Sequence, residues 1–303
     1  MHLYRRSAIY MDTHVSLQIV TDVAVDDMEE RAARAFGWFA TVEASCSRFE
    51  ASSEVTRLSH TVGRAVEVSP LLFTLVQFSL EVARLSGGAL DPTLGYTLEQ
   101  RGFNRNYRTG RVVTTSVAPG PPATYEDVLL DPVQQTVTLR VPLTLDLGAV
   151  AKGCAIDLAA KELDVFSNYT VEAGGDIYVS GHNLDDGPWQ VGIRHPRRPG
   201  ELIEHLVVTD IAVCTSGDYE RPRPTGQGHH LVDPATQQSP TGVASATVIA
   251  PTAMVADSLS TAASILGIER GLRFLEDQGV EGLMVSPTLE RFSTPGFTEY
   301  RQC

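Results

Sequence analysis

The chain has 303 residues, of which 43% are hydrophobic and 20% charged, and its formal net charge at pH 7 is −13. Such a length and composition are typical of a globular protein with a sizeable core. The acidic balance argues against nucleic acids and anionic membrane surfaces as partners, because both attract clustered Lys and Arg. A phosphate ligand would instead need local backbone N–H groups or a divalent cation.

The four cysteines, Cys46, Cys154, Cys214 and Cys303, are scattered and form no CxxC pair or Cys/His cluster. We therefore expect buried, reduced thiols, with neither a zinc site nor a disulfide framework. No segment reaches the roughly 18 apolar residues of a membrane span, and the N-terminal stretch shows no signal-peptide pattern or lipidation-type Cys. These features lead us to expect a cytoplasmic protein.

Short patterns in the first part of the chain predict a strand, two helices and a loop. Residues 8–20 alternate in part and predict an opening strand. Residues 26–46 have helical spacing, and residues 69–86 begin with Ser-Pro and end before a Gly-Gly pair, as a helix would. The Pro-rich segment 112–125 predicts a loop.

Helix and strand patterns mix without strict order in the rest of the chain. Strands are expected within 128–140, 143–148, 169–181 and 189–250. Helices are expected at 149–163, 252–267 and 269–278. Because there is no regular βαβ alternation, the pattern favours an α+β fold over a doubly wound sheet.

The segment TLDLGAVAKGCAIDLAA, residues 144–160, predicts a strand that leads into a helix. We expect Asp146 to end the strand, Gly148 to permit the turn, and Lys152 and Gly153 to lie in the first helical turn. Free N–H groups at a helix start, together with a lysine, can bind an anion. The spacing does not match a P-loop, and on spacing alone a strand–helix junction capped by Asp146 is favoured.

Two turn-rich segments contain further candidates. Gly174 and Gly175 would let a ligand or another backbone approach closely, although by themselves they favour a plain hairpin turn. Residues 214–234 gather hydroxyl, acidic and imidazole side chains. There His230 and Asp233 could form a base with an orienting carboxylate, or the histidine could be an exposed loop residue. No GxSxG motif occurs, which disfavours a serine hydrolase.

Asp257 is the only charged residue between Gly242 and Ile268, in a segment with helical spacing. On a helical wheel it lies beside Thr261, opposite an apolar stripe. A solvated outer face is one interpretation, but such a face normally carries more charge. A carboxylate and a hydroxyl also suit Mg²⁺ or Ca²⁺, with carbonyls and waters completing the shell. The residues alone leave both interpretations open.

Seven motifs, in this order, resemble those of the ApbE-type FAD:protein FMN transferases, formerly described as thiamine biosynthesis lipoproteins. They are CSRFEASSEVTRLS, GGALDPTLG, DLGAVAKGCAID, EAGGDIYVSG, TSGDYER, HHLVDPATQ and VIAPTAMVADSLSTAASILG. The resemblance implies an α+β fold of mixed, largely antiparallel sheets with flanking helices. It also implies one catalytic unit over residues 1–303, which could comprise two intertwined subdomains with the FAD site between them.

The activity that the resemblance implies is Mg²⁺-dependent flavin transfer. Such an enzyme cleaves FAD and attaches FMN through a phosphoester to a Thr or Ser hydroxyl of an acceptor protein, releasing AMP. FAD and the acceptor protein would be the partners, with no nucleic acid. Two alternatives stay open: an FAD pyrophosphatase giving FMN and AMP, and a flavin-binding protein without turnover.

The resemblance also implies roles for individual residues. The metal ligands would be the Ala149 carbonyl, the Asp257 carboxylate and the Thr261 hydroxyl, with Ser260 beside them, and Asp257 would thereby serve catalysis. His230, in the pattern His-x-x-Asp-Pro, would be the base that activates the acceptor hydroxyl, since its ordinary pKa of about 6.5 suits that role. The implied flavin-contacting residues are Met11, Phe49, Ala89, Leu90, Asp91, Asp146, Lys152, Gly174, Gly175, Ser216, Gly217 and Val232.

The sequence departs from the family pattern at two turns. Asp12 follows Met11 where relatives often have Gly, and Gln238 stands where a Gly usually follows the DPATQ turn. The first departure puts the backbone contacts of Met11 in question.

Overall fold

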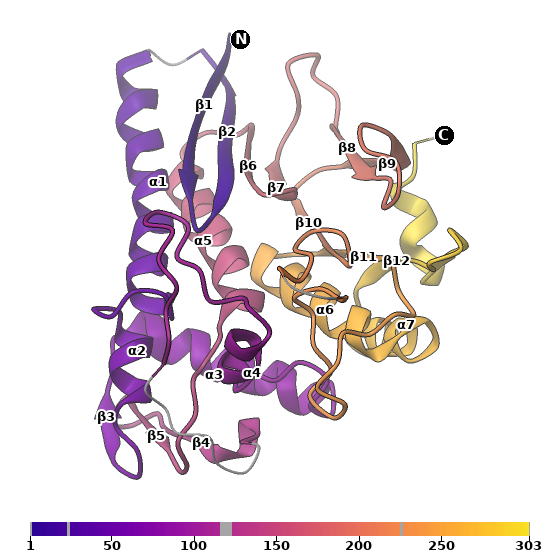
Figure 1. The fold of residues 1–303 in the computed structure, drawn as a ribbon. Helices are drawn as coiled ribbons and strands as arrows, with labels where there is room; N and C mark the ends of the chain where they lie inside the picture. The colour runs from indigo at the N-terminus through magenta and orange to yellow at the C-terminus, as the bar shows by residue number, and fades with distance from the viewer. Residues whose placement is uncertain (1, 23–24, 116–122, 225–226, 303) are drawn as a thin grey trace.

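The computed structural model describes residues 2–22, 25–115, 123–224 and 227–302. Its centre is an eight-stranded sheet of order β1-β2-β6-β7-β10-β11-β12-β13 (Figure 1). The strands are β1 (His2–Tyr10), β2 (Thr13–Thr21), β6 (Tyr169–Ala173), β7 (Asp176–Ser180), β10 (Ile211–Gly217), β11 (Ser245–Ala250), β12 (Glu281–Val285) and β13 (Arg291–Ser293). Neighbouring strands of this sheet pair antiparallel.

Two small antiparallel sheets and the helices surround this centre. One small sheet contains β3 (Ala65–Glu67), β5 (Thr136–Leu139) and β4 (Val128–Asp131), and the other contains β8 (Trp189–Arg194) and β9 (Leu202–Val208). The α-helices are α1 (Val25–Cys46), α2 (Glu54–Ser59), α3 (Pro70–Leu85), α4 (Gly95–Gln100), α5 (Gly148–Leu163), α6 (Ala253–Leu266) and α7 (Ile268–Asp277). The predicted α+β class, with largely antiparallel sheets and flanking helices, is confirmed.

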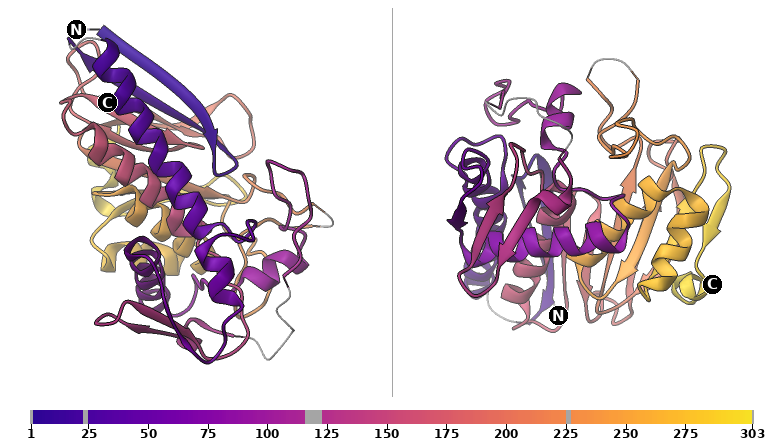
Figure 2. Two further views of the ribbon diagram at one scale, coloured as in Figure 1. Left: turned by 90° about the vertical axis from the view of Figure 1, so that its left-hand side faces the viewer. Right: turned by 90° about the horizontal axis from the view of Figure 1, so that it is seen from below.

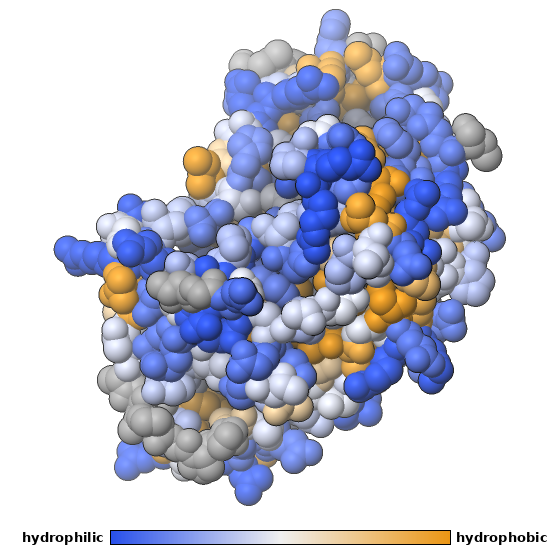
Figure 3. Space-filling model, turned by 45° about the vertical axis from the view of Figure 1, so that its right-hand side comes forward, coloured by the Kyte–Doolittle hydropathy of each residue, from blue (hydrophilic) through white to orange (hydrophobic). Residues whose placement is uncertain are grey.

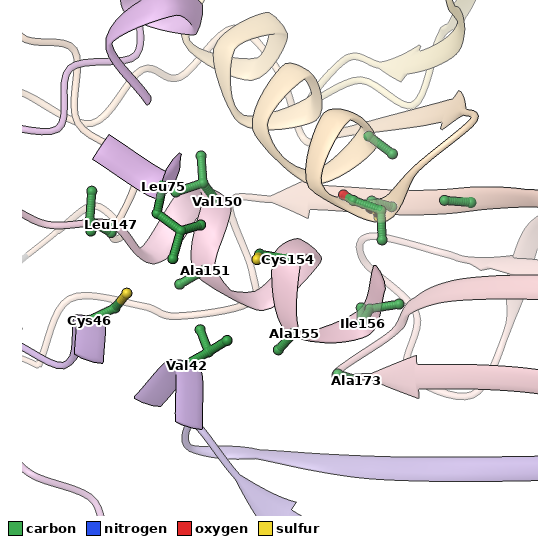
Figure 4. Close-up of a cluster of buried hydrophobic side chains, with 14 of the residues drawn as sticks. Val42, Cys46, Leu75, Leu147, Val150, Ala151, Cys154, Ala155, Ile156 and Ala173 are labelled. Atoms are coloured by element: carbon green, nitrogen blue, oxygen red, sulfur yellow. Dashed lines mark hydrogen bonds between the residues drawn. The ribbon is translucent and has the colours of Figure 1, made fainter. Parts of the chain in front are cut away.

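The main hydrophobic core lies between the helices and one face of the large sheet. Helix α5 packs against α1 and against α6, and Figure 2 shows the long β1–β2 hairpin beside α1. Figure 4 shows Val42 of α1 facing Ala155 of α5 within this core. A second cluster lies on the other face of the sheet, beneath β8 and β9. The helices that carry predicted site residues, α5 and α6, are thus held from several sides.

None of the described helices is long and apolar enough to cross a membrane. Figure 3 shows polar side chains over most of one face, interrupted by smaller apolar areas. Of the thiols, Cys46, Cys154 and Cys214 are free and buried, as predicted. Cys303 lies outside the described residues.

Most predicted elements are confirmed, but the single strand over 8–20 is wrong. The chain reverses at Met11 and Asp12, whose φ angles are 51° and 61°, and forms the β1–β2 hairpin. Two consecutive residues with positive φ match a type I′ turn, which joins antiparallel strands tightly. Neither residue is the usual Asn or Gly of such a turn, so the sequence carried no turn signal.

The strand predicted over 143–148 is also wrong. Only Thr144 forms a bridge, to Leu94, and the Asp146 N–H donates to the carbonyl of Pro92 at 2.8 Å. Asp146 therefore lies in an extended segment and not at the end of a strand. The short helices α2 and α4, six residues each, were not predicted. The loop predicted over 112–125 falls partly outside the described residues.

The two hairpin turns of the large sheet lie against each other, which leads to a first prediction. Gly174 has φ 63°, and a Cβ there would lie 2.5 Å from Thr13 Oγ1, whereas Gly63, with φ 73°, has nothing within 4 Å. Gly63→Ala should cost about 1–2 kcal/mol in the free energy of unfolding from backbone strain alone. Gly174→Ala should cost more, as urea unfolding can measure. Equal losses in the two variants would contradict the close approach.

Candidate active site

A partly buried ion pair between Arg48 and Asp146 joins the residues after α1 to the start of α5. The Asp146 carboxylate accepts from Arg48 Nε at 2.5 Å and from the Gly148 N–H at 2.9 Å. These bonds and the charge of Arg48 outweigh burial and lower the pKa of Asp146. The Arg48 guanidinium also stacks over Phe49, 4.2 Å from its ring centre. Arg48, which was not predicted as a site residue, therefore brings together Phe49 and Asp146, two predicted flavin-contacting residues.

Both carboxylate oxygens of Asp91, another predicted flavin-contacting residue, already accept hydrogen bonds from nearby residues. One of its oxygens accepts from the N–H and hydroxyl of Thr93 at 2.9 and 2.7 Å, and the other accepts from the Tyr125 N–H at 3.0 Å. Burial raises the pKa of this carboxyl, against these hydrogen bonds. Asp91 thus shapes the loop that carries Ala89 and Leu90.

Asp257 is buried, with 5% of its surface exposed, so a solvated outer face is excluded. The Lys152 ammonium lies 3.1 Å from its carboxylate and also forms an ion pair with Asp176. Burial raises the pKa of Asp257, while the charge of Lys152 and a hydrogen bond from the Gly153 N–H oppose the rise. Neither Lys152 nor Asp176 was predicted as a neighbour of Asp257.

A group of hydroxyls lies next to Asp257. Ser216 Oγ is 2.8 Å from Ser260 Oγ and 3.0 Å from Thr261 Oγ1, and Ser260 Oγ donates to the Asp257 carbonyl at 2.8 Å. Ser216 comes from the end of β10, so the predicted flavin and metal residues meet here. The predicted Ser260 and Thr261 hydroxyls therefore lie on the same side of α6 as the Ser216 side chain.

Gly153 and Asp157 of α5 fix the position of α6. A Cβ on Gly153 would lie 2.4 Å from the Ala253 carbonyl oxygen, so only glycine allows this approach. The Asp157 carboxylate accepts from the N–H groups of Ala253 and Met254 at 2.7 and 2.9 Å, and burial raises its pKa to about 6. Gly153 was predicted only as part of the helix start, and Asp157 was not predicted as a site residue. Their i and i+4 spacing on one helix face was the available signal.

The oxygen atoms around Asp257 fit a hard cation. The Gly153 N–H acts on the Asp257 carboxylate, and Ala149 lies one helical turn before Gly153, at the start of α5. Across the described part of the chain, no group of three or more His, Cys, Asp or Glu side chains could hold a metal. A cation here would therefore depend on one carboxylate, a carbonyl and a hydroxyl, which is a donor set of oxygens alone.

His230 lies in a hairpin that follows β10, and burial is the main cause that lowers its pKa to about 3, followed by the charges of Arg221 and His229. Its Nδ1 is buried and has no hydrogen-bond partner in the described ranges. The predicted pairing with Asp233 is wrong: that carboxylate accepts from the Ala235 N–H at 2.9 Å and the Thr236 hydroxyl at 3.0 Å. Asp233 is used within its own turn, as is common for Asp in turns.

The low pKa of His230 predicts a pH dependence of stability. The folded value of about 3 lies below the unfolded value near 6.5, so the unfolded chain binds more protons between them. The contribution of His230 is then fully present above about pH 6.5 and is lost as the pH falls toward about 3.

The variant His230→Gln cannot titrate, and it isolates this contribution. The stability of wild type minus that of the variant should fall as the pH is lowered through this window, as urea unfolding at several pH values can measure. Asp157, with its raised pKa, changes stability in the opposite direction, but it is present in both proteins. Parallel stability curves would show that His230 keeps an ordinary pKa when folded.

The remaining predicted residues lie at different depths. Leu90 and Val232 are buried, at 5% and 2% exposure, and Met11 donates its N–H to Glu43 at 3.4 Å. A Cβ on Gly217 would lie 2.5 Å from the Tyr219 ring. No bond among the described residues joins Leu90, Val232 or Met11 directly to Asp257, so their flavin contacts stay predictions.

This fold is shared with solved ApbE structures. The chain is similar to the ApbE protein of Thermotoga maritima, with a TM-score of 0.88 and 28% identity over 100% of both chains. It is also similar to the flavin transferase ApbE of Vibrio cholerae, with a TM-score of 0.86 and 26% identity over 99% of both chains.

The sequence comparison gives the same result. The model of the ApbE family matches residues 11–284, and the chain belongs to that family. It is 31% identical over 262 residues to the FAD:protein FMN transferase of Vibrio cholerae, covering 84% of this chain and 77% of the relative. The enzyme of that name from Treponema pallidum is 30% identical, covering 94% of this chain and 84% of the relative. The predicted family resemblance is confirmed.

Proposed function

We propose that this protein is a Mg²⁺-dependent flavin transferase that moves FMN from FAD to a Thr or Ser hydroxyl of an acceptor protein. The acceptor oxygen forms a bond to the FMN phosphorus, the P–O–P bond breaks, and the bridging oxygen leaves with AMP. The observation that carries the proposal is the convergence of Asp257, Lys152 and the Ser216–Thr261 hydroxyl pair at the start of α5. Membership of the ApbE family also supports the proposal.

The residues at this site suit that reaction. Asp257, Thr261 and the Ala149 carbonyl would hold the Mg²⁺, with Ser260 beside them. When bound, the ion would neutralise charge on the diphosphate oxygens. Lys152 already carries a positive charge at the carboxylates, and N–H groups at the start of α5 can receive phosphate oxygens.

His230 is the proposed base. Because its pKa is lowered to about 3, the imidazole is neutral throughout the physiological range and has a free lone pair for the hydroxyl proton. A pKa so far below the operating pH makes it a weaker base than an ordinary histidine. Asp233 does not orient it, so the orientation of the ring must come from burial and from the hairpin. The predicted flavin contacts at Phe49, Gly174 and Gly175 would hold the rest of FAD.

The proposal can be tested with purified protein, FAD, Mg²⁺ and a candidate acceptor. We expect covalent fluorescent flavin on the acceptor and one AMP released per flavin transferred. FMN and AMP in equal amounts without covalent flavin would show an FAD pyrophosphatase instead. FAD binding without release of AMP over a range of acceptors would show a flavin-binding protein, and the absence of both binding and turnover would refute a flavin function.

A further inference from the structure

Arg221 follows β10 and lies at the base of the hairpin that carries His230. The His230 N–H donates to the Arg221 carbonyl at 3.1 Å, and Pro222 pairs with His229 in an antiparallel bridge. The Arg221 residue is exposed. These backbone bonds therefore fix the main chain of Arg221 next to that of His230, the proposed base.

The charge of Arg221 reaches the groups that form the candidate site. Asp146, Asp257 and His230 all lie within electrostatic range of its guanidinium. These groups come from the start of α5, from α6 and from the hairpin, and the charge of Arg221 acts on all three. The proposed function places the FAD diphosphate between these groups.

Two other cations of this site, Arg48 and Lys152, are already paired. Arg48 is held by Asp146 at 2.5 Å, and Lys152 is held by Asp176 and Asp257. Within the described ranges, the guanidinium of Arg221 makes no ion pair and no hydrogen bond. An unpaired guanidinium at a site lined by carboxylates keeps all of its donors for a ligand.

We propose that Arg221 is a diphosphate-binding residue that receives the non-bridging phosphate oxygens of FAD. This inference rests on the proposed function. A guanidinium binds phosphate through two parallel N–H donors, a geometry that an ammonium cannot reproduce. As the P–O–P bond breaks and AMP leaves with the bridging oxygen, negative charge grows on the departing phosphate, and Arg221 offsets it without a change in its own protonation.

The test compares FAD with riboflavin, which has the same ring system but no phosphate. Binding is followed by flavin fluorescence for wild type, Arg221→Gln and Arg221→Lys. Arg270→Gln is the matched control, because Arg270 is also exposed and unpaired among the described residues but lies on α7. We expect Arg221→Gln to weaken FAD binding about 10- to 100-fold, because the loss of a hydrogen bond to a charged group lowers affinity by about that factor.

Riboflavin binding and the thermal midpoint should stay unchanged in Arg221→Gln, and Arg221→Lys should recover part of the FAD affinity. Arg270→Gln should behave as wild type. FAD binding by Arg221→Gln equal to that of Arg270→Gln would overturn the inference, and so would an equal loss of FAD and riboflavin. Wild-type protein that binds neither flavin would overturn the proposed function and the inference with it, whereas the first two outcomes overturn the inference alone.

Discussion

Asp257→Asn is expected to reduce the rate of AMP release from FAD about 10²- to 10³-fold, while the protein stays folded. The change removes the only carboxylate of the proposed cation site and keeps the shape of the side chain. Losing one preorganised charge contact at a reacting centre typically costs that much in rate. Asn would leave the Lys152–Asp176 ion pair in place, so the ammonium is not left alone in a buried position.

A second measurement separates cation binding from catalysis. If Asp257 is a ligand, Mg²⁺ should raise the thermal midpoint of wild type, because a ligand that binds only the folded state stabilises it. The same addition should have little effect on Asp257→Asn. Asp277→Asn, an exposed acidic residue on α7, is the matched control and should keep both the rate and the Mg²⁺ effect. Turnover at the wild-type rate in Asp257→Asn would rule out this role.

The longer helices were predictable because their signals are local. Ser69 caps α3 through a bond to the Leu72 N–H at 3.2 Å, and Pro70 occupies its first turn. The turn at Met11 and Asp12 was not predictable, because those residues lack the Asn-Gly or Gly-Gly pattern of type I′ turns. Its conformation is imposed by the pairing of β1 with β2.

Candidate residues of the site could be proposed from the sequence, but the contacts between them could not. The helix face that carries Asp257 and Thr261 has too few other charges for a solvated surface. In the structure Asp257 is buried. The partners Lys152 and Asp176 come from segments far away in the sequence, so no spacing rule could join them. Arg48 was missed for the same reason, because its partner Asp146 lies 98 residues further along the chain.

The closeness of α5 and α6 can be tested by adding one methyl group. In Gly153→Ala the Cβ would meet the Ala253 carbonyl oxygen at 2.4 Å and Met254 Cα at 2.5 Å, both atoms of the backbone. Such overpacking costs about 1–3 kcal/mol in the free energy of unfolding, which outweighs the gain of up to about 1 kcal/mol when Ala replaces Gly in a helix.

Gly37→Ala is the matched control for this change. Gly37 is exposed within α1, and a Cβ there meets nothing within 4 Å, so the helix propensity of Ala should stabilise the protein by up to about 1 kcal/mol. Urea unfolding should therefore move the two variants in opposite directions from wild type. A Gly153→Ala protein as stable as Gly37→Ala would show that α5 and α6 are further apart than the structure has them.

The same variant should also change activity at temperatures where it is fully folded. If α6 moves away from α5, Asp257 moves away from Lys152, because α6 carries the carboxylate and α5 carries the ammonium. A misplacement of about 1 Å can cost about 10²-fold in rate. Gly153→Ala should thus lose turnover as well as stability, whereas Gly37→Ala should keep wild-type turnover. A folded Gly153→Ala protein with full activity would mean that the site does not depend on this helix contact.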